Sequence, residues 1–358
     1  VMILSSYSYE KQWSTALAKE IRNHLETQSP ELKVRITYAG ITARTSYVAD
    51  RFAMQGAFAN GQLSDKIRVP DVLVLIGDES WMIYRSMDHR GVWQNIPVVL
   101  CGVHAEVLAD YKQFFPDKQL SDASFIPLRD SASEMNVTAV IEPDNAARTL
   151  QLAQTLMPDL QHLYFLSDGS YSDSYTGMKL LQESKKKNVA FTEIFTERCN
   201  TDSIGRVLME LPSGAMVLIN DALVPQSLQV PVLALRDMSY GACTPLGGYF
   251  APISTFATQT AETVFRTLEM GKIDELPYIV VADTAYYLNQ TALMHAGLRS
   301  EVKGLSDTVN RNIPPPFIFR HIRIIAVILV IMIVLAFVIY RMVSSRRYSR
   351  NLNLLSIR

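Results

Sequence analysis

The fold is decided by two stretches, Asp71–Gly77 (DVLVLIG) and Ile96–Val103 (IPVVLCGV). Both are continuous apolar runs, and neither alternates between apolar and polar positions. Such runs are typical of parallel strands buried on both faces, because helices cover both sides of a parallel sheet. The two stretches therefore predict a parallel sheet in the first part of the chain.

Strands and helices alternate outward from these runs. Val1–Ser5 is another apolar stretch, and Leu32–Tyr38 alternates as a strand does. Between them, a spacing of four predicts one helix face, formed by Trp13, Leu17, Ile21 and Leu25. From His104 to about Glu134 we expect a long polar connection.

A second series of elements begins at Val137. Its later strands are predicted at Leu163–Leu166, Ala190–Phe195, Met216–Asn220 and Val232–Leu235. Its helices are predicted from Asp144 to Pro158 and at Tyr175–Lys187 and Ser203–Leu211, with a returning helix at Ile253–Met270. This alternation implies an α/β fold with doubly wound parallel sheets. We expect two Rossmann-like lobes within residues 1–312, the first formed by about 1–134 plus 250–300 and the second by about 135–249.

Composition limits the function. The chain has 358 residues, of which 48% are apolar and 19% charged, so disorder is excluded. A net charge of −1 argues against nucleic-acid binding. The 3 cysteines exclude a disulfide scaffold, although one bond between Cys199 and Cys243 remains open. Residues after Ile322 carry 6 arginines and no acid, which leaves 28 basic and 35 acidic residues before them.

A membrane span separates the acidic body from this basic tail. Ile324–Tyr340 (IIAVILVIMIVLAFVIY) contains no charge, glycine or proline, and as a helix it covers about 25 Å. The alternative is a buried core helix, which is rarely apolar on every face. We predict a transmembrane helix at 321–343 after a proline-rich linker at 313–320.

Arginines set the expected orientation of this helix. Four follow it within ten residues and two precede it, so the positive-inside rule places residues 1–320 in the periplasm and the C-terminus in the cytoplasm. Residues 344–358 then begin a cytoplasmic signalling helix. We also expect a signal peptide or first span before Val1, and an output domain beyond Arg358.

Candidate ligand-binding residues follow the strands, because ligands of open α/β sheets bind beyond the carboxyl ends of the strands. Hydroxyl, carboxylate, aromatic and arginine side chains together suit a small polar ligand such as a sugar, nucleoside or amine. Serine and aspartate in such loops also cap helices, which is the alternative for each of them. The candidates are Tyr7, Trp13, Asp78, His104, Asp168, Tyr171, Asp221 and Arg236.

Motifs for chemistry are missing from the sequence. The histidines have no metal-ligand spacing, and no G-x-S-x-G, P-loop or G-x-G-x-x-G pattern occurs. We therefore expect no catalytic residue, metal or cofactor. Asp78 and Glu79 are adjacent acids, a pattern common in the first turn of a helix. Cys101 lies in an apolar run and is predicted to be a core residue.

Several short motifs carry a family resemblance. They are Val137–Glu142, Thr149–Ala153, Leu166–Asp168, Leu211–Gly214, Pro231-Val232 and Leu246–Gly248. With them the chain resembles the substrate-binding proteins of ABC transporters, which have the type I periplasmic-binding fold. Leu4–Tyr7 followed by Trp13 resembles the version found as an extracytoplasmic sensor domain, before one membrane span and a histidine kinase or, less often, a diguanylate cyclase. The resemblance implies that Glu142 also faces the cleft.

Three functional hypotheses remain. The first is the sensor and membrane portion of a homodimeric two-component sensor histidine kinase, in which a small ligand or a periplasmic protein moves the lobes. Pro314–Pro316 would then pass that movement to the span, because polyproline is semi-rigid. The second is a membrane-tethered binding protein that delivers ligand to an ABC transporter. The third, an extracytoplasmic enzyme, requires a catalytic constellation that the sequence does not contain.

Overall fold

The computed structural model describes residues 1–41, 46–62, 69–87, 95–115, 120, 124–132, 135–196, 201–220, 230–238, 245–270, 278–298, 305–313 and 322–355. The chain divides into two compact units, Val1–Arg311 and Asn312–Arg358. The first unit holds two sheets, and we call each sheet with its helices a lobe.

The sheet of the first lobe is parallel throughout and has the order β13-β7-β4-β3-β1-β2. The two apolar runs form its neighbouring central strands, with Leu73 opposite Val98 and Ile76 opposite Cys101. Both strands are buried along their whole length, as predicted. The strands are β1 (Met2–Ser5), β2 (Arg35–Tyr38), β3 (Leu73–Ile76), β4 (Val98–Val103), β7 (Val137–Ile141) and β13 (Tyr278–Val281).

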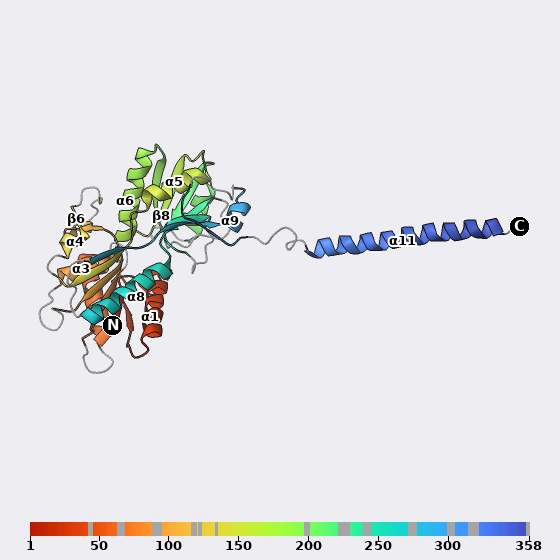
Figure 1. Ribbon diagram of the computed structural model, residues 1–358. Coiled ribbons are helices and arrows are strands. Elements are labelled where there is room, and N and C mark those ends of the chain that lie inside the picture. The colour runs from red at the N-terminus through yellow and green to blue at the C-terminus, as the bar shows by residue number, and fades with distance from the viewer. Residues whose placement is uncertain are drawn as a thin grey trace. The chain divides into compact units, whose positions relative to one another are not determined.

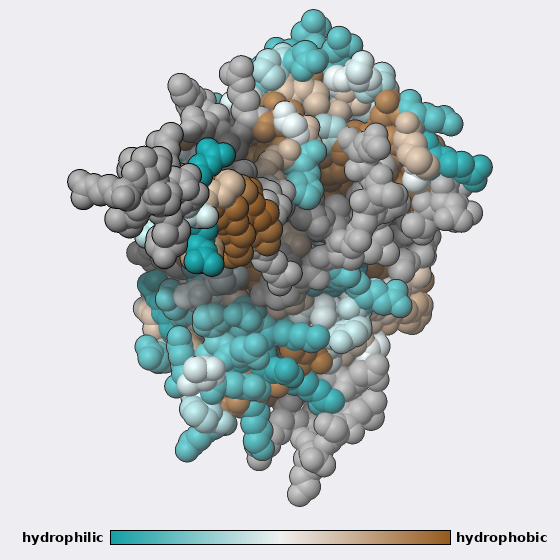
Figure 2. All heavy atoms as spheres, turned by 90° about the vertical axis from the view of Figure 1, so that its right-hand side faces the viewer, coloured by the Kyte–Doolittle hydropathy of each residue, from teal (hydrophilic) through white to brown (hydrophobic). Residues whose placement is uncertain are grey.

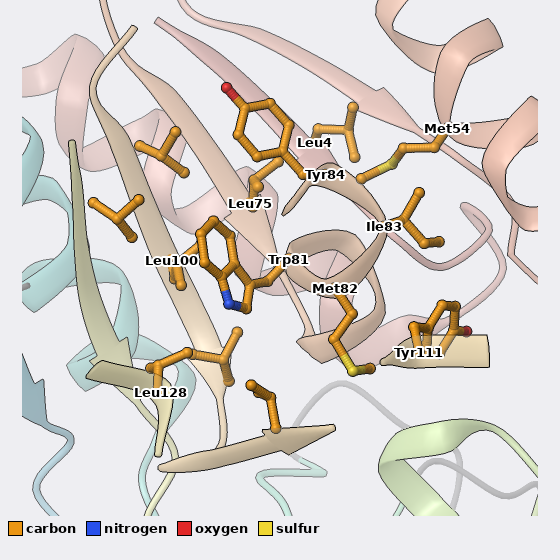
Figure 3. Packing of buried hydrophobic residues seen from close by; sticks show 14 of the residues in the cluster. Leu4, Met54, Leu75, Trp81, Met82, Ile83, Tyr84, Leu100, Tyr111 and Leu128 are labelled. Atoms are coloured by element: carbon orange, nitrogen blue, oxygen red, sulfur yellow. The ribbon is translucent and has the colours of Figure 1, made fainter. Parts of the chain in front are cut away.

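Helices cover both faces of this sheet. α1 (Gln12–Gln28) and α8 (Ile253–Met270) lie side by side on one face (Figure 1). The predicted face of α1 is buried there, and α8 has its predicted bounds. α2 (Tyr47–Gln62) and α3 (Asp78–Ser86) pack on the other face. There Trp81 and Tyr84 of α3 point toward the side chains of the sheet (Figure 3).

The segment expected to be a long polar connection contains its own small elements. β5 (Glu106–Leu108) and β6 (Phe125–Pro127) form an antiparallel pair, accompanied by the 3-10 helix η1 (Tyr111–Phe114) and by α4 (Leu128–Ser131). Tyr111, Phe114 and Leu128 are buried in the same cluster as α3. These scattered apolar residues, rather than a periodic pattern, hold the segment against the first lobe.

The second sheet has the order β15-β14-β12-β11-β10-β8-β9, and among its described strands only the β12–β14 pairing is antiparallel. α5 (Ala146–Leu156), α6 (Tyr171–Lys186) and α9 (Gln290–His295) pack on one face, and α7 (Thr201–Met209) packs on the other. The strands are β8 (His162–Ser167), β9 (Ala190–Phe195), β10 (Ala215–Ile219), β11 (Val232–Ala234), β12 (Gly247–Phe250), β14 (Ala285–Asn289) and β15 (Thr308–Arg311).

The expected borders of the lobes need two corrections. The predicted border near residue 134 places β7 in the second lobe, but β7 pairs with β4 and β13 in the first sheet. The predicted first lobe includes β14 and α9, but both belong to the second. An apolar run looks alike in either sheet, so only the crossings of the chain decide its place. The chain crosses between the lobes after β7, after β12 and after β13.

The second unit contains α11 (Ile322–Leu355). Ala326–Arg346 of this helix is a candidate membrane span with a mean hydropathy of 2.8, and none of it is buried. Its apolar side chains give it a hydrophobic surface (Figure 2). The helix continues without a break from the span to Leu355, in agreement with the helix predicted after residue 343. The proline triplet of the linker lies outside the described residues.

Candidate functional site

The carboxyl ends of the strands of both sheets meet between the lobes. The first lobe contributes the residues after β1, β3, β4 and β7, and the second contributes those after β8, β10 and β11 together with the start of α6. We call this zone the interlobe seam. Its residues from the first lobe are Tyr7, Lys11, Trp13, Asp78, Glu79, His104 and Glu142, and those from the second are Asp168, Ser172, Asp173, Asn220 and Arg236.

Glu142 and Arg236 form a buried ion pair across the seam. Arg236 Nε donates to both carboxylate oxygens at 3.0 and 3.1 Å, and its Nη2 donates to Oε2 at 2.6 Å. Nη2 also donates to Ser172 Oγ at 3.0 Å. Burial disfavours the guanidinium charge, but Glu142 outweighs it and raises the pKa of Arg236. Arg236 therefore stays charged, and its hydrogen bonds with Glu142 join the lobes.

The indole of Trp13 lies under this ion pair. The guanidinium carbon of Arg236 stands 4.4 Å from the ring centroid, a cation–π contact. The ring is 3% exposed, and the edge of Phe256 packs against it. Among the described residues, none accepts a hydrogen bond from the buried indole Nε1.

A second ion pair, between Lys11 and Asp168, also joins the lobes. Burial raises the pKa of Asp168, but the Lys11 charge and the hydrogen bonds around the carboxylate outweigh burial and hold the pKa at about 2. The buried Asp173 accepts hydrogen bonds from the Asp168 backbone N–H and from Asn220 Nδ2. Burial, followed by the Asp168 charge, raises the pKa of Asp173 well above its usual value.

Glu79 makes the third connection. Its Oε2 accepts from the Tyr7 hydroxyl at 3.1 Å, and its Oε1 accepts from the Ser172 backbone N–H of the other lobe at 3.4 Å. Burial, followed by the Asp78 charge, raises the pKa of Glu79 to about 7. Gly77 permits this convergence, because its φ is +90° and a Cβ there would stand 2.7 Å from Ser6 Oγ.

Asp78 holds His104 in place. Its carboxylate accepts from the His104 backbone N–H at 2.8 Å and lies 2.7 Å from the ring Nδ1. Burial lowers the pKa of His104, but Asp78 outweighs it and the net shift is upward. The ring packs on Tyr175 of α6, with 4.3 Å between centroids. The upward shift favours the protonated form of the ring, which Asp78 holds at the seam.

A hollow lies beside these groups. It encloses about 380 Å³ of empty space, part of it open to solvent. It is lined by polar groups of both lobes, among them His104, Glu142, Asn145, Tyr175, Lys179 and Asn220. Within the described part of the chain, no group of three His, Cys, Asp or Glu residues is placed to hold a metal ion.

Of the nine predicted site residues, seven lie at the seam as described above. Tyr171 lies against the first lobe, where its buried ring contacts Tyr111 and Phe114, and it also contacts Tyr175 of its own helix. Asp221 lies outside the described residues, as do Cys199 and Cys243. Cys101 is buried in the core as predicted, and burial raises its pKa to about 12.

Sequence reasoning missed five seam residues: Lys11, Glu79, Ser172, Asp173 and Asn220. Glu79 was read with Asp78 as an acid in the first turn of a helix, which it also is. Ser172 and Asp173 begin α6, where such residues ordinarily serve the helix terminus. Nothing in the nearby sequence distinguishes residues that only cap the helix from residues that also contact the other lobe.

Comparison with known proteins defines the fold. No protein-family model matches the chain, and no curated protein matches it. Among solved structures, an ABC domain from Streptococcus pneumonia in complex with L-Trp aligns with a TM-score of 0.59 and 12% identity, over 86% of this chain and 99% of that one. A conserved domain protein from Vibrio cholerae O1 biovar El Tor aligns with a TM-score of 0.57 and 14% identity, over 87% and 99%. The chain has the type I periplasmic-binding fold, as predicted.

Proposed function

We propose that this chain is the ligand-sensing and membrane-spanning portion of a signal-transduction receptor. A small polar ligand binds between the lobes and changes their separation. The main support is the seam itself, where buried charged side chains of both lobes meet at the carboxyl ends of the strands. In open α/β sheets this is the place where ligands bind.

The proposed topology follows the charge pattern. Residues 1–320 lie in the periplasm, α11 crosses the inner membrane, and the C-terminus enters the cytoplasm. The receptor is a homodimer, since a second copy gives the span a neighbour against which it can move. The output domain is a histidine kinase of a two-component system.

One contact favours a receptor over a plain anchor. Asp237 follows Arg236 of the seam, and its Oδ1 accepts from Arg311 Nη1 at 3.2 Å. The guanidinium of Arg311 also stacks on Tyr287, 4.2 Å from the ring centroid. Arg311 ends β15, the edge strand from which the chain runs on toward α11. A movement of the Arg236 loop is therefore passed to the segment that leads to the membrane.

The second candidate is a tethered binding protein that supplies a transporter. The similar structure from Streptococcus pneumonia is an ABC domain in complex with L-Trp. That complex supports a small-molecule cleft in either candidate. The two candidates differ in whether ligand binding alters β15.

The first experiment is a thermal-shift screen of the full chain in lipid nanodiscs. The probes are sugars, amino acids, nucleosides and polyamines, because a molecule that binds only the folded state raises its melting temperature. We expect at least one probe to raise it, and Arg236→Gln to reduce the shift. A folded chain that no probe stabilises contradicts a small-molecule receptor.

Hydrogen exchange then separates the two candidates. For a receptor, the stabilising probe changes the exchange of the β15 amides in the wild type, and Arg311→Gln removes that change. Exchange at β15 that is the same with and without the probe supports the tethered binding protein.

A further inference from the structure

We propose that the ligand of the interlobe seam is a zwitterion, a small molecule whose carboxylate and ammonium groups lie close together, as in an α-amino acid. This inference rests on the proposed ligand-binding function and specifies the chemical class of the ligand.

The Glu142–Arg236 pair joins the two lobes where a ligand would enter. Its two members come from different lobes, and three hydrogen bonds of 2.6 to 3.1 Å join them directly. A ligand that binds between these lobes at this point must separate the two side chains. Glu142 and Arg236 are 8% and 7% exposed, so water does not readily take the place of the lost partner.

A buried charge that loses its partner is strongly destabilising, whereas a pair that exchanges partners is not. A neutral polyol leaves both charges unpaired, and an anion or a cation leaves one of them unpaired. A zwitterion gives a carboxylate to Arg236 and an ammonium to Glu142. It is the simplest ligand that keeps both buried charges paired.

Trp13 supplies an independent observation. Its ring contacts the Arg236 guanidinium, yet its own buried N–H has no acceptor among the described residues. A buried donor without an acceptor is costly. A ligand carboxylate bound to Arg236 at the edge of this ring supplies that acceptor. The Arg236 guanidinium and the Trp13 indole N–H then form one binding site for a carboxylate group.

The Lys11–Asp168 pair does not impose the same requirement. Its side chains are 32% and 20% exposed, so water can solvate them when they separate. This pair can close over a ligand of any charge. The selection for a zwitterion therefore lies at Glu142 and Arg236.

The test measures binding to the full chain in nanodiscs by titration calorimetry. The probes are the twenty protein L-amino acids and, for each one that binds, its decarboxylated amine and its deaminated acid. Both analogues are smaller than the parent, so neither introduces a clash. We expect each to bind about 100-fold more weakly than the amino acid, or worse.

Variants assign each charge to its partner. In Glu142→Gln the preference for the amino acid over the deaminated acid should fall to within about threefold, while the preference over the amine remains. In Arg236→Gln the preference for the amino acid over the amine should fall, while the preference over the deaminated acid remains. Lys186→Gln, which removes an exposed charge paired with Glu183, should keep both preferences. If Glu142→Gln does not fold, Glu142→Asp retains the charge and must retain the discrimination with weaker affinity.

The outcomes are distinct. A sugar, nucleoside or polyamine that binds when no amino acid does overturns the zwitterion and leaves the receptor intact. So does an amino acid whose amine or acid analogue binds equally well. A folded chain that binds none of these probes overturns both the zwitterion and the proposed function.

Discussion

The backbone of Gly102 lies directly against the indole of Trp13. A Cβ at position 102 would stand 2.7 Å from Trp13 Cη2, and Gly102 has a φ of +63°. Glycine therefore serves two needs at the end of β4: a left-handed backbone and contact with a flat ring. The ring in turn supports Arg236 at the seam.

Gly102→Ala should destabilise the chain by about 2–5 kcal/mol, because the left-handed backbone costs about 1–2 kcal/mol and the overpacked ring about 1–3 kcal/mol more. Urea unfolding checks this. Gly297→Ala is the matched control, with a φ of +68° and nothing within 4 Å of its Cβ, so only the backbone cost of about 1–2 kcal/mol remains. Equal losses in the two variants would show that the Trp13 contact does not matter.

Glu79→Gln should change the pH dependence of stability. The folded chain holds the Glu79 proton up to about pH 7 against a usual value of 4.5, so the wild type loses stability as pH rises through that window. The loss is about 3 kcal/mol. Glutamine does not titrate, so the variant should gain that amount relative to the wild type between about pH 4 and pH 8. The free energy of unfolding of both proteins is measured by denaturant unfolding across this range. If it changes with pH in the same way in both, the raised pKa does not belong to Glu79.

Arg236→Gln should lower the free energy of unfolding by about 3–5 kcal/mol, because it leaves Glu142 buried without its partner. Denaturant unfolding of the wild type and the variant measures the difference. Lys186→Gln removes one member of an exposed pair and should change stability by less than about 1 kcal/mol. A similar small effect for both substitutions would mean that the seam is solvated.

Asp78→Asn should reverse the shift of the His104 pKa. The carboxylate now outweighs burial and keeps the pKa above 6.5, and without its charge burial should move the pKa below that value. The His104–Asp78 pair stabilises the folded chain fully below pH 6.5, and this contribution is lost as pH rises through the folded pKa. Titration of the His104 ring resonances by NMR measures the change, with the exposed Asp159→Asn as control. An unchanged titration would contradict the pairing.

The sequence predicts the parts of the fold that local patterns determine. β3 and β4 are recognised because both faces of these strands are buried, and α1 because its apolar residues repeat every four positions. The lobe to which β7 and β14 belong is not predicted. That choice depends on where the chain crosses between sheets, and apolar strands of the two sheets have the same pattern.

The residues of the seam are predicted only in part, because local patterns identify the loops but not the contacts between them. The rule that ligands bind at strand ends selects the loops that contain His104 and Arg236, and the structure brings these loops together. The pairing of Glu142 with Arg236 joins residues 94 positions apart, and no local pattern carries such a contact. Lys11 was missed because an isolated lysine before a helix carries no signal of a partner in the other lobe.

The crossings of the chain also govern the order in which it can fold during synthesis. β13 completes the first sheet beside β7 only after all the strands from β8 to β12 have emerged. Until then β7 remains an open edge, where another chain could pair with it. The second sheet likewise waits for β14 and β15. Neither lobe is therefore encoded by one continuous segment that could be expressed alone. A nascent chain must also keep the edges of both sheets from mispairing until its last strands are made.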